Sequence, residues 1–306
     1  MRKRCLNTVY ELAKKNDKIV FIGSDLGYKT LEEFKNEFPN QFIMEGISEQ
    51  NLVGMSAGIA EEGKIVYTNT IATFITRRSC EQNILNLGLL NANVRLIGNG
   101  GGLVYAPLGP THLATDDIAL TRLIPNMTII VPTDADEMER AVRASEAHQG
   151  PIYFRLAKGG DPIVSDPKHG FEIGKAIIHK EAADILLIAC GIMVQRALTI
   201  AEDLAKEGIS VGVTNVHTIK PLDTKTISEQ ISKAKIVLSL EEHSKIGGLG
   251  SAISELISES KDLNPETFKR VALPDCFPDQ YGSQDHLIER YEIGIDSIKK
   301  MIKGYL

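Results

Sequence analysis

The chain has 306 residues, of which 43% are hydrophobic and 24% charged, a composition typical of globular proteins. Its length predicts two domains rather than one core. The formal net charge of −6 argues against nucleic acid or an anionic membrane surface as a partner, and no apolar run is long enough to span a bilayer.

The first segment, residues 1–17, is basic at its tip but lacks the apolar region and cleavage site of a signal peptide. We therefore expect it to form the first helix of a cytoplasmic protein. The cysteines are scattered without CxxC spacing, which argues against a metal site or a disulfide framework. We expect all of them to be buried, reduced thiols. They are Cys5, Cys80, Cys190 and Cys276.

Short apolar runs alternate with helix-period segments in the first half of the chain, which is the pattern of parallel α/β units. The strands that these runs predict are residues 18–22, 65–67, 94–98, 127–131 and 151–156. A helix is expected over residues 77–90. Another is expected over residues 132–146, because its opening Pro-Thr-Asp is a helix-start signal.

A stretch rich in glycine and proline, residues 158–174, has no clear periodicity and predicts an interdomain linker. Beyond it the alternation resumes. It predicts strands at 185–189, 210–214 and 236–240, and helices at 194–207 and 247–258. The expected fold class is α/β, with two tandem three-layer α/β/α domains built on mostly parallel sheets. We place the domains at residues 1–165 and 175–306, joined by residues 166–174.

Glu49 stands where a glycine-containing turn enters a helix that carries Gly54, Ala57 and Gly58. Small residues on a helix face let another element approach closely. Spacing alone favours a structural role, in which Glu49 caps the helix and is kept ionised by the helix dipole. A functional role needs further support.

Four segments, in this order and at these distances, resemble those of transketolases. They are residues 45–60 (EGISEQNLVGMSAGIA), 67–82 (YTNTIATFITRRSCEQ), 109–112 (GPTH) and 241–250 (EEHSKIGGLG). The similarity covers nearly the whole chain. GPTH favours transketolases and deoxyxylulose-phosphate synthases over the β subunits of oxo-acid dehydrogenases. The resemblance implies a pyrimidine-binding domain for thiamine diphosphate, followed by a transketolase C-terminal domain.

The resemblance also implies which residues contact the cofactor. A family glutamate at the position of Glu49 bonds the aminopyrimidine ring, which helps the cofactor's own amino group to take up a proton. Phe74 falls where the family stacks an aromatic ring on the pyrimidine, and Ile71 replaces a phenylalanine common in transketolases. Asp25 resembles a position beside the cofactor, although a plain turn aspartate is the simpler interpretation.

On the substrate side, the resemblance implies a role for His112, whose family counterpart helps with proton transfer or polarises the donor's oxygen. Lys158 aligns with a position, often arginine, that touches substrate phosphate, and an exposed loop lysine is the alternative. Leu108 and Gly100 replace an aspartate and a histidine that bind sugar hydroxyls in the family. A hydroxyl without its partner costs about 1–3 kcal/mol, so we expect a non-standard or modified sugar.

Full-length transketolases grip the diphosphate and its Mg²⁺ with a GDG element followed by an asparagine, and this sequence has no GDG. We therefore expect no metal ligand in this chain. An N-terminal transketolase-like subunit would hold the diphosphate and Mg²⁺, with two copies of each subunit in an α2β2 heterotetramer. The expected function is that of the β subunit of a split transketolase, which transfers a two-carbon ketol unit from a ketose to an aldehyde.

Two alternatives remain open. One is a deoxyxylulose-phosphate synthase-like or acyl-transferring C–C ligase with a 2-oxo acid donor, which Leu108 and Gly100 favour. The other is a non-catalytic structural or regulatory partner subunit. Glu49 and His112 argue against the second alternative, because a retired site need not retain either residue.

Overall fold

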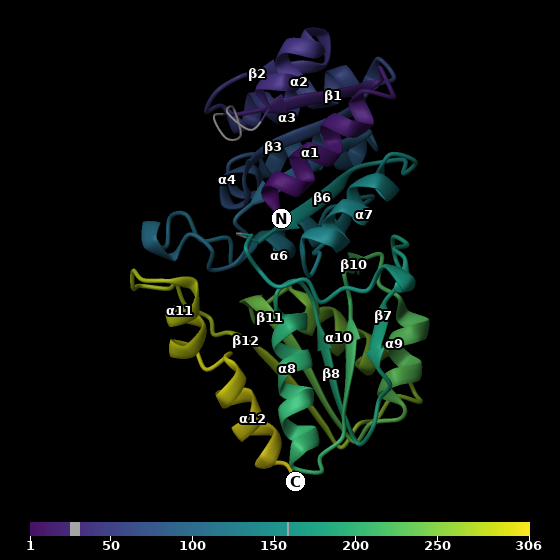
Figure 1. Ribbon diagram of the computed structural model, residues 1–306, viewed down its shortest axis with the longest axis vertical. Helices are drawn as coiled ribbons and strands as arrows, with labels where there is room; N and C mark the ends of the chain where they lie inside the picture. The colour runs from purple at the N-terminus through teal and green to yellow at the C-terminus, as the bar shows by residue number, and fades with distance from the viewer. Residues whose placement is uncertain (25–30, 158) are drawn as a thin grey trace.

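The computed structural model describes residues 1–24, 31–157 and 159–306. Its strands form two mostly parallel sheets that lie one beyond the other along the longest axis, with helices on both faces of each (Figure 1). This arrangement confirms the α/β fold class of two three-layer halves expected from the sequence. Among the described residues, no helix has the length and apolar character that a bilayer crossing requires.

The first sheet has seven strands in the order β10-β5-β6-β4-β3-β1-β2. Their bounds are β1 Ile19–Gly23, β2 Phe42–Met44, β3 Ile65–Ile71, β4 Val94–Asn99, β5 Thr128–Ile130, β6 Ile152–Leu156 and β10 Thr218–Lys220. All neighbours pair in parallel except β10, which pairs antiparallel with β5 at the edge. Because β10 comes from the second half of the chain, one hydrogen-bonded sheet draws on both halves.

Alternate residues of each central strand enter opposite cores, so both faces of the first sheet are covered. Phe21 of β1 packs into the core that holds the first helix, whereas Val20 and Ile22 pack into the core beneath the helix that begins at Glu49. The helical segments of this half are α1 Arg2–Ala13, α2 Glu32–Glu37, η2 Pro39–Gln41, α3 Glu49–Glu61, α4 Ala72–Arg77, α5 Cys80–Gln82, η3 Asn83–Leu89, η4 Ala106–Leu108, α6 Asp117–Arg122 and α7 Ala135–Ser145.

The second sheet has five strands in the order β12-β11-β8-β9-β7, of which only β7 pairs antiparallel. Helices α8 and α12 pack together on one of its faces, and α9 and α10 lie on the other (Figure 1). The bounds are β7 Ile177–Lys180, β8 Ile185–Ala189, β9 Val211–Asn215, β11 Ile236–Ser244, β12 Thr267–Leu273, η5 Pro167–His169, α8 Met193–Lys206, α9 Thr224–Ile231, α10 Leu249–Glu259, α11 Gln284–Arg290 and α12 Ile295–Lys303.

One expected element is wrong. Residues 77–90 do not form a single helix: α4 ends at Arg77, and after the short α5 the chain continues as the π-helix η3. Asn83 bridges the break, because its side-chain amide donates a hydrogen bond to the carbonyl of Ile75 at 2.8 Å. Turns of π-helix are often found at functional sites, and this one follows the segment that carries Phe74.

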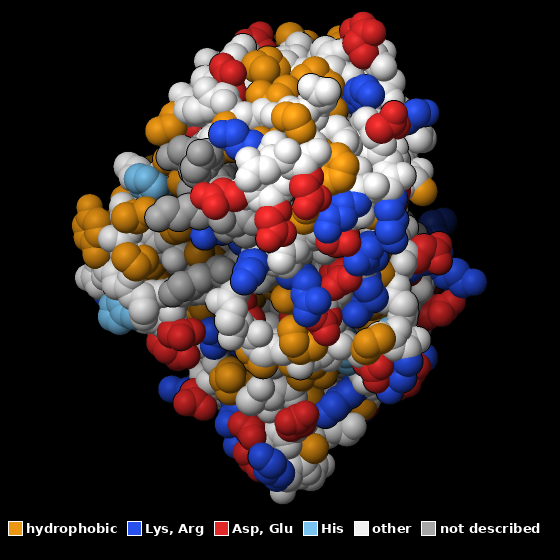
Figure 2. Space-filling model, turned by 45° about the horizontal axis from the view of Figure 1, so that its top comes forward, with side chains coloured by type: hydrophobic (Ala, Val, Ile, Leu, Met, Phe, Trp, Pro, Cys, Tyr) orange, Lys and Arg blue, Asp and Glu red, His pale blue; other side chains and the backbone are white. Residues whose placement is uncertain are grey.

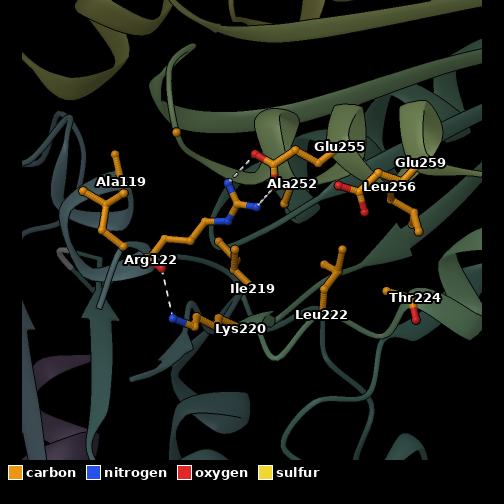
Figure 3. Close-up of a pocket in the computed structure, with 12 residues that line it drawn as sticks. Ala119, Arg122, Ile219, Lys220, Leu222, Thr224, Ala252, Glu255, Leu256 and Glu259 are labelled. Carbon is orange, nitrogen blue, oxygen red and sulfur yellow. Dashed lines mark hydrogen bonds and ion pairs between the residues drawn. The ribbon is translucent and has the colours of Figure 1, made fainter. Parts of the chain in front are cut away.

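A groove of about 480 Å³ separates the two halves on one side. Arg122 of α6 pairs with both carboxylate oxygens of Glu255 of α10, and Lys220 donates a hydrogen bond to the carbonyl of Arg122 at 3.0 Å (Figure 3). These polar contacts bridge the halves across the groove. The residues that line it do not include Glu49 or any other residue of the cavity beside Glu49.

A buried ion pair lies at the centre of the contact between the two halves, here called the joint. Arg155 of β6 and Asp117 of α6 are 6% and 0% exposed, and their Nε and Oδ2 atoms lie 2.7 Å apart. The guanidinium of Arg155 also donates to the carbonyls of Ala114 and Glu242, at 2.9 and 2.8 Å. One side chain therefore ties the first sheet, the segment before α6 and strand β11 together.

Replacing Asp117 with asparagine leaves the charge of Arg155 buried without its counter-ion. We expect Asp117→Asn to lower the free energy of unfolding in urea by about 3 kcal/mol. Asp116→Asn is the matched control. Its partner Arg77 is partly exposed, so the loss should stay below about 1 kcal/mol. Equal losses in the two variants would contradict the central role of the buried pair.

Candidate active site

The candidate site begins at the carboxyl edge of the first sheet, where parallel α/β folds place their ligands. Strand β3 ends at Ile71, which is paired in register with Asn99 at the end of β4. The side-chain amide of Asn99 donates to Asn69 Oδ1 at 2.7 Å and to the carbonyl of Thr70 at 2.8 Å. Helices α3 and α4 both begin close to this edge, because each follows a strand of the same parallel sheet.

Glu49 is the first residue of α3, and its side chain is only 4% exposed. Its Oε2 atom accepts a hydrogen bond from Nη1 of Arg78 at 3.0 Å. Both residues line a cavity of about 720 Å³. In the same cavity, Oγ of Ser48 is buried and has no hydrogen-bond partner in the described part of the chain. The cavity is therefore lined by a nearly buried carboxylate, and an unsatisfied hydroxyl is buried in its wall.

An unbroken row of contacts connects Glu49 to the aromatic segment and to the GPTH turn. The guanidinium of Arg78 lies over the ring of Phe74, 4.0 Å from its centroid. The imidazole of His112 meets the same ring edge-on, with the centroids 5.1 Å apart and the planes at 68°. The structure thus brings together Glu49, Phe74 and His112, which come from three separate segments of the sequence.

Arg78 is the member of this row that sequence reasoning missed. The signal was present, because Arg78 lies four residues after Phe74 and such residues share one face of a helix. Nothing in the sequence showed that α3 would bring Glu49 to the same guanidinium. The neighbouring Arg77 points elsewhere and binds Asp116 and the carbonyl of Leu113.

Gly100 and Leu108 occupy the positions at which the sequence departs from the family pattern. Gly100 is buried with a φ of +76°, and a Cβ atom there would lie 2.1 Å from the ring of Tyr105. A side chain at this position would clash with that ring, and the left-handed backbone conformation itself favours glycine. Leu108 is 50% exposed at the end of η4, beside Gly109, which packs against Tyr281 of the second half.

The remaining predicted site residues are distributed as follows. Ile71 is half-buried and directly precedes α4. Asp25 and Lys158 lie outside the described residues. Among the residues that the structure describes, no group of three His, Cys, Asp or Glu side chains could hold a metal ion.

The cysteines only partly match expectation. Cys5 and Cys190 are buried, whereas Cys80 is half-buried. Cys276 is exposed, which corrects the expectation that all four are core residues. It lies in the irregular stretch between β12 and α11, which has little core to enter.

The loop that carries His112 is anchored by the second half of the chain. Glu242 of β11 accepts hydrogen bonds at Oε1 from the backbone N–H of Leu103 and from Gln284, at 2.8 and 2.7 Å. Gly102 makes room for it, because a Cβ there would lie 2.5 Å from the carboxyl carbon of Glu242. This loop follows β4 and projects to the left in Figure 1, toward the segment before α11.

The chain matches two family models, the transketolase pyrimidine binding domain at residues 1–160 and the transketolase C-terminal domain at residues 174–298. It therefore belongs to the transketolase family. It is 35% identical to the 6-deoxy-6-sulfo-D-fructose transketolase subunit SqwH of Clostridium sp. (strain MSTE9), over 95% of this chain and 89% of that protein.

Two further comparisons also cover most of both chains. An apulose-4-phosphate transketolase subunit of Phocaeicola vulgatus is 35% identical over 90% of this chain and 87% of that protein. A solved structure of a split gene transketolase, an inactive beta4 tetramer, has a TM-score of 0.89 and 33% identity, and the match covers 99% and 97% of the two chains. The chain thus resembles separate transketolase subunits over nearly their full length.

Burial raises the pKa of Glu242 from its usual 4.5 to about 7. The folded chain then binds this proton more tightly than the unfolded chain does, so the free energy of unfolding should fall as the pH rises from about 4.5 to about 7. We expect Glu242→Gln, which cannot ionise, to make this fall clearly smaller.

Urea unfolding of wild type and variant at pH 5 and pH 8 measures the difference. Glu137 also makes the free energy of unfolding fall with pH, in wild type and variant alike, because burial raises its pKa to about 7. An undiminished slope in Glu242→Gln would refute the assignment to Glu242.

Proposed function

We propose that this chain is the C-terminal (β) subunit of a thiamine diphosphate-dependent split transketolase, which transfers a two-carbon ketol unit from a ketose donor to an aldehyde acceptor. The observation that carries the proposal is the row of Glu49, Phe74 and His112 at the carboxyl edge of the first sheet. These residues come from three separate segments, which follow one another in the sequence in the same order as in the transketolase family.

The side chains of this site suit the aminopyrimidine end of the cofactor. Glu49 provides a buried carboxylate that can share a proton with a ring nitrogen, and Phe74 provides a flat apolar face for stacking. When bound, thiamine diphosphate supplies the nucleophilic carbon that carries the two-carbon unit. We assign Ile71 and Asp25 to the surroundings of the ring.

His112 lies beyond Phe74 as seen from Glu49, so we assign it to the substrate. Its role is to hold or move a proton at the donor's or acceptor's oxygen. Gly100 and Leu108 present no polar side chain to a sugar hydroxyl, and the relatives described above act, by their names, on a sulfosugar and on apulose 4-phosphate. We propose a modified sugar as substrate, with Lys158 at its phosphate or other anionic group.

Exposed apolar side chains just before α3 and along η3 support docking of an N-terminal transketolase-like subunit that holds the diphosphate and Mg²⁺. Helix α3 packs against η3, and a Cβ at Gly54 or Gly58 of α3 would meet nothing within 4 Å. The predicted close approach to these glycines is therefore left to another chain. The exposed apolar residues here are Ile47, Ile84, Leu85, Leu89 and Leu90. Patches of this kind are typical of protein interfaces.

The proposed assembly is a heterotetramer with two copies of each subunit, located in the cytoplasm. The domains are proposed at residues 1–165 and 175–306, with residues 166–174 as the linker.

Hydrophobic side chains also gather at the left of Figure 2, on the side toward which the loop with the GPTH turn projects in Figure 1. This loop is proposed to border the substrate entrance.

Glu49→Gln keeps the size of the side chain but removes the carboxylate that shares the proton. In the complex reconstituted with the N-terminal subunit, we expect kcat to fall at least about 100-fold, the lower range for loss of acid–base catalysis. Glu61→Gln, at the other, exposed end of α3, is the control and should stay within about twofold of wild type. Unchanged turnover in Glu49→Gln would leave Glu49 as a helix-capping residue.

A donor screen separates ketol transfer from the 2-oxo acid alternative. With an aldehyde acceptor present, we expect turnover with ketose phosphates or sulfoketoses as donors and no carbon dioxide release from pyruvate. Mass spectrometry of the products and a carbon dioxide assay provide the two measurements. Turnover with pyruvate alone would replace the transketolase proposal by the synthase-like alternative.

A further inference from the structure

We infer that Arg78 occupies, in the free chain, the place where the aminopyrimidine ring of the cofactor binds, and that Arg78 must leave when the cofactor enters. This inference rests on the proposed function. It adds to the site a residue that sets the affinity for the cofactor, acting by competition for Glu49 and Phe74.

The guanidinium makes the two contacts that the pyrimidine requires. It donates an N–H to Glu49 Oε2 at 3.0 Å, as a protonated ring nitrogen would, and it lies 4.0 Å over the ring of Phe74. A guanidinium is flat, cationic and rich in N–H donors, and it stacks on aromatic faces. It therefore resembles a protonated aminopyrimidine in shape, in charge and in hydrogen bonding.

The guanidinium of Arg78 and the pyrimidine ring cannot occupy this space at the same time. A ring that bonds Glu49 and stacks on Phe74 has to lie between them, on the face of Phe74 that Arg78 now covers. Binding of the pyrimidine therefore requires the guanidinium to move.

The position of Arg78 explains both its presence and its readiness to leave. A carboxylate as buried as that of Glu49 is costly when unpaired, and Arg78 provides the counter-charge. The Arg78 side chain itself is 49% exposed, so water can solvate it once it has moved. Arg155 shows the opposite case, because it is 6% exposed and held by three acceptors.

Competition of this kind lowers the apparent affinity by the fraction of molecules in which the site is open. We expect Arg78→Met in the reconstituted complex to bind thiamine diphosphate with Mg²⁺ about tenfold more tightly than wild type in calorimetric titration, equivalent to about 1.4 kcal/mol. Arg143→Met is the matched control. Arg143 is 46% exposed, pairs with Glu139 at 2.8 Å and lies on α7, and its replacement should leave the affinity unchanged.

Nitrogen-15 NMR of the arginine side chains provides a readout independent of activity and of any variant at Arg78 that fails to fold. In the free wild-type chain, the Nε–H signal of Arg78 should be shifted upfield by the ring of Phe74 and lose that shift in Phe74→Leu. Addition of the partner, thiamine diphosphate and Mg²⁺ should remove the shift in wild type. Persistence of the shift in the loaded complex would overturn the inference.

The outcomes separate this inference from the proposed function. If the wild-type complex binds the cofactor, but Arg78→Met binds it equally or more weakly, the displacement inference fails and the proposed function stands. If the wild-type complex binds no cofactor, both fail.

Discussion

A carboxylate that is nearly removed from water needs a hydrogen-bond donor, and this constraint on Glu49 organises the site. The short strand β2 and the turn after it deliver Glu49 to the first position of α3, where its side chain is 4% exposed. In the free chain, its donor is the guanidinium of Arg78. In the proposed complex the cofactor is the hydrogen-bond donor to Glu49. The cost of leaving this buried carboxylate unpaired therefore accounts for its partner in the free chain and in the complex.

The other end of the site depends on the joint between the halves. Arg155 ties β6 to the segment before α6 and to β11, and Glu242 holds the backbone of the GGLVYAP loop at Leu103. The GPTH turn that follows this loop carries His112, whose ring lies 5.1 Å from that of Phe74. The second half therefore contributes to the site without supplying a side chain to the row itself.

The sequence predicts the central strands well because they are buried on both faces and appear as continuous apolar runs. It does not predict β2, β7, β10 or β12. Strand β10 is only three residues long, and β12, with the sequence TFKRVAL, carries charges at a sheet edge. The site residues Glu49, Phe74 and His112 were identified by resemblance. The roles of Arg78 and Glu242 depend on side-chain contacts between distant segments, which no local pattern reveals.

The central claim is that this chain holds only the pyrimidine end of thiamine diphosphate, between Glu49 and Phe74, while a partner subunit holds the diphosphate. The most direct test is calorimetric titration of thiamine diphosphate with Mg²⁺ into this chain alone and into its mixture with an N-terminal transketolase-like subunit. Binding in the mixture alone is the predicted result. Tight binding to the isolated chain, or no binding in either sample, would contradict the claim.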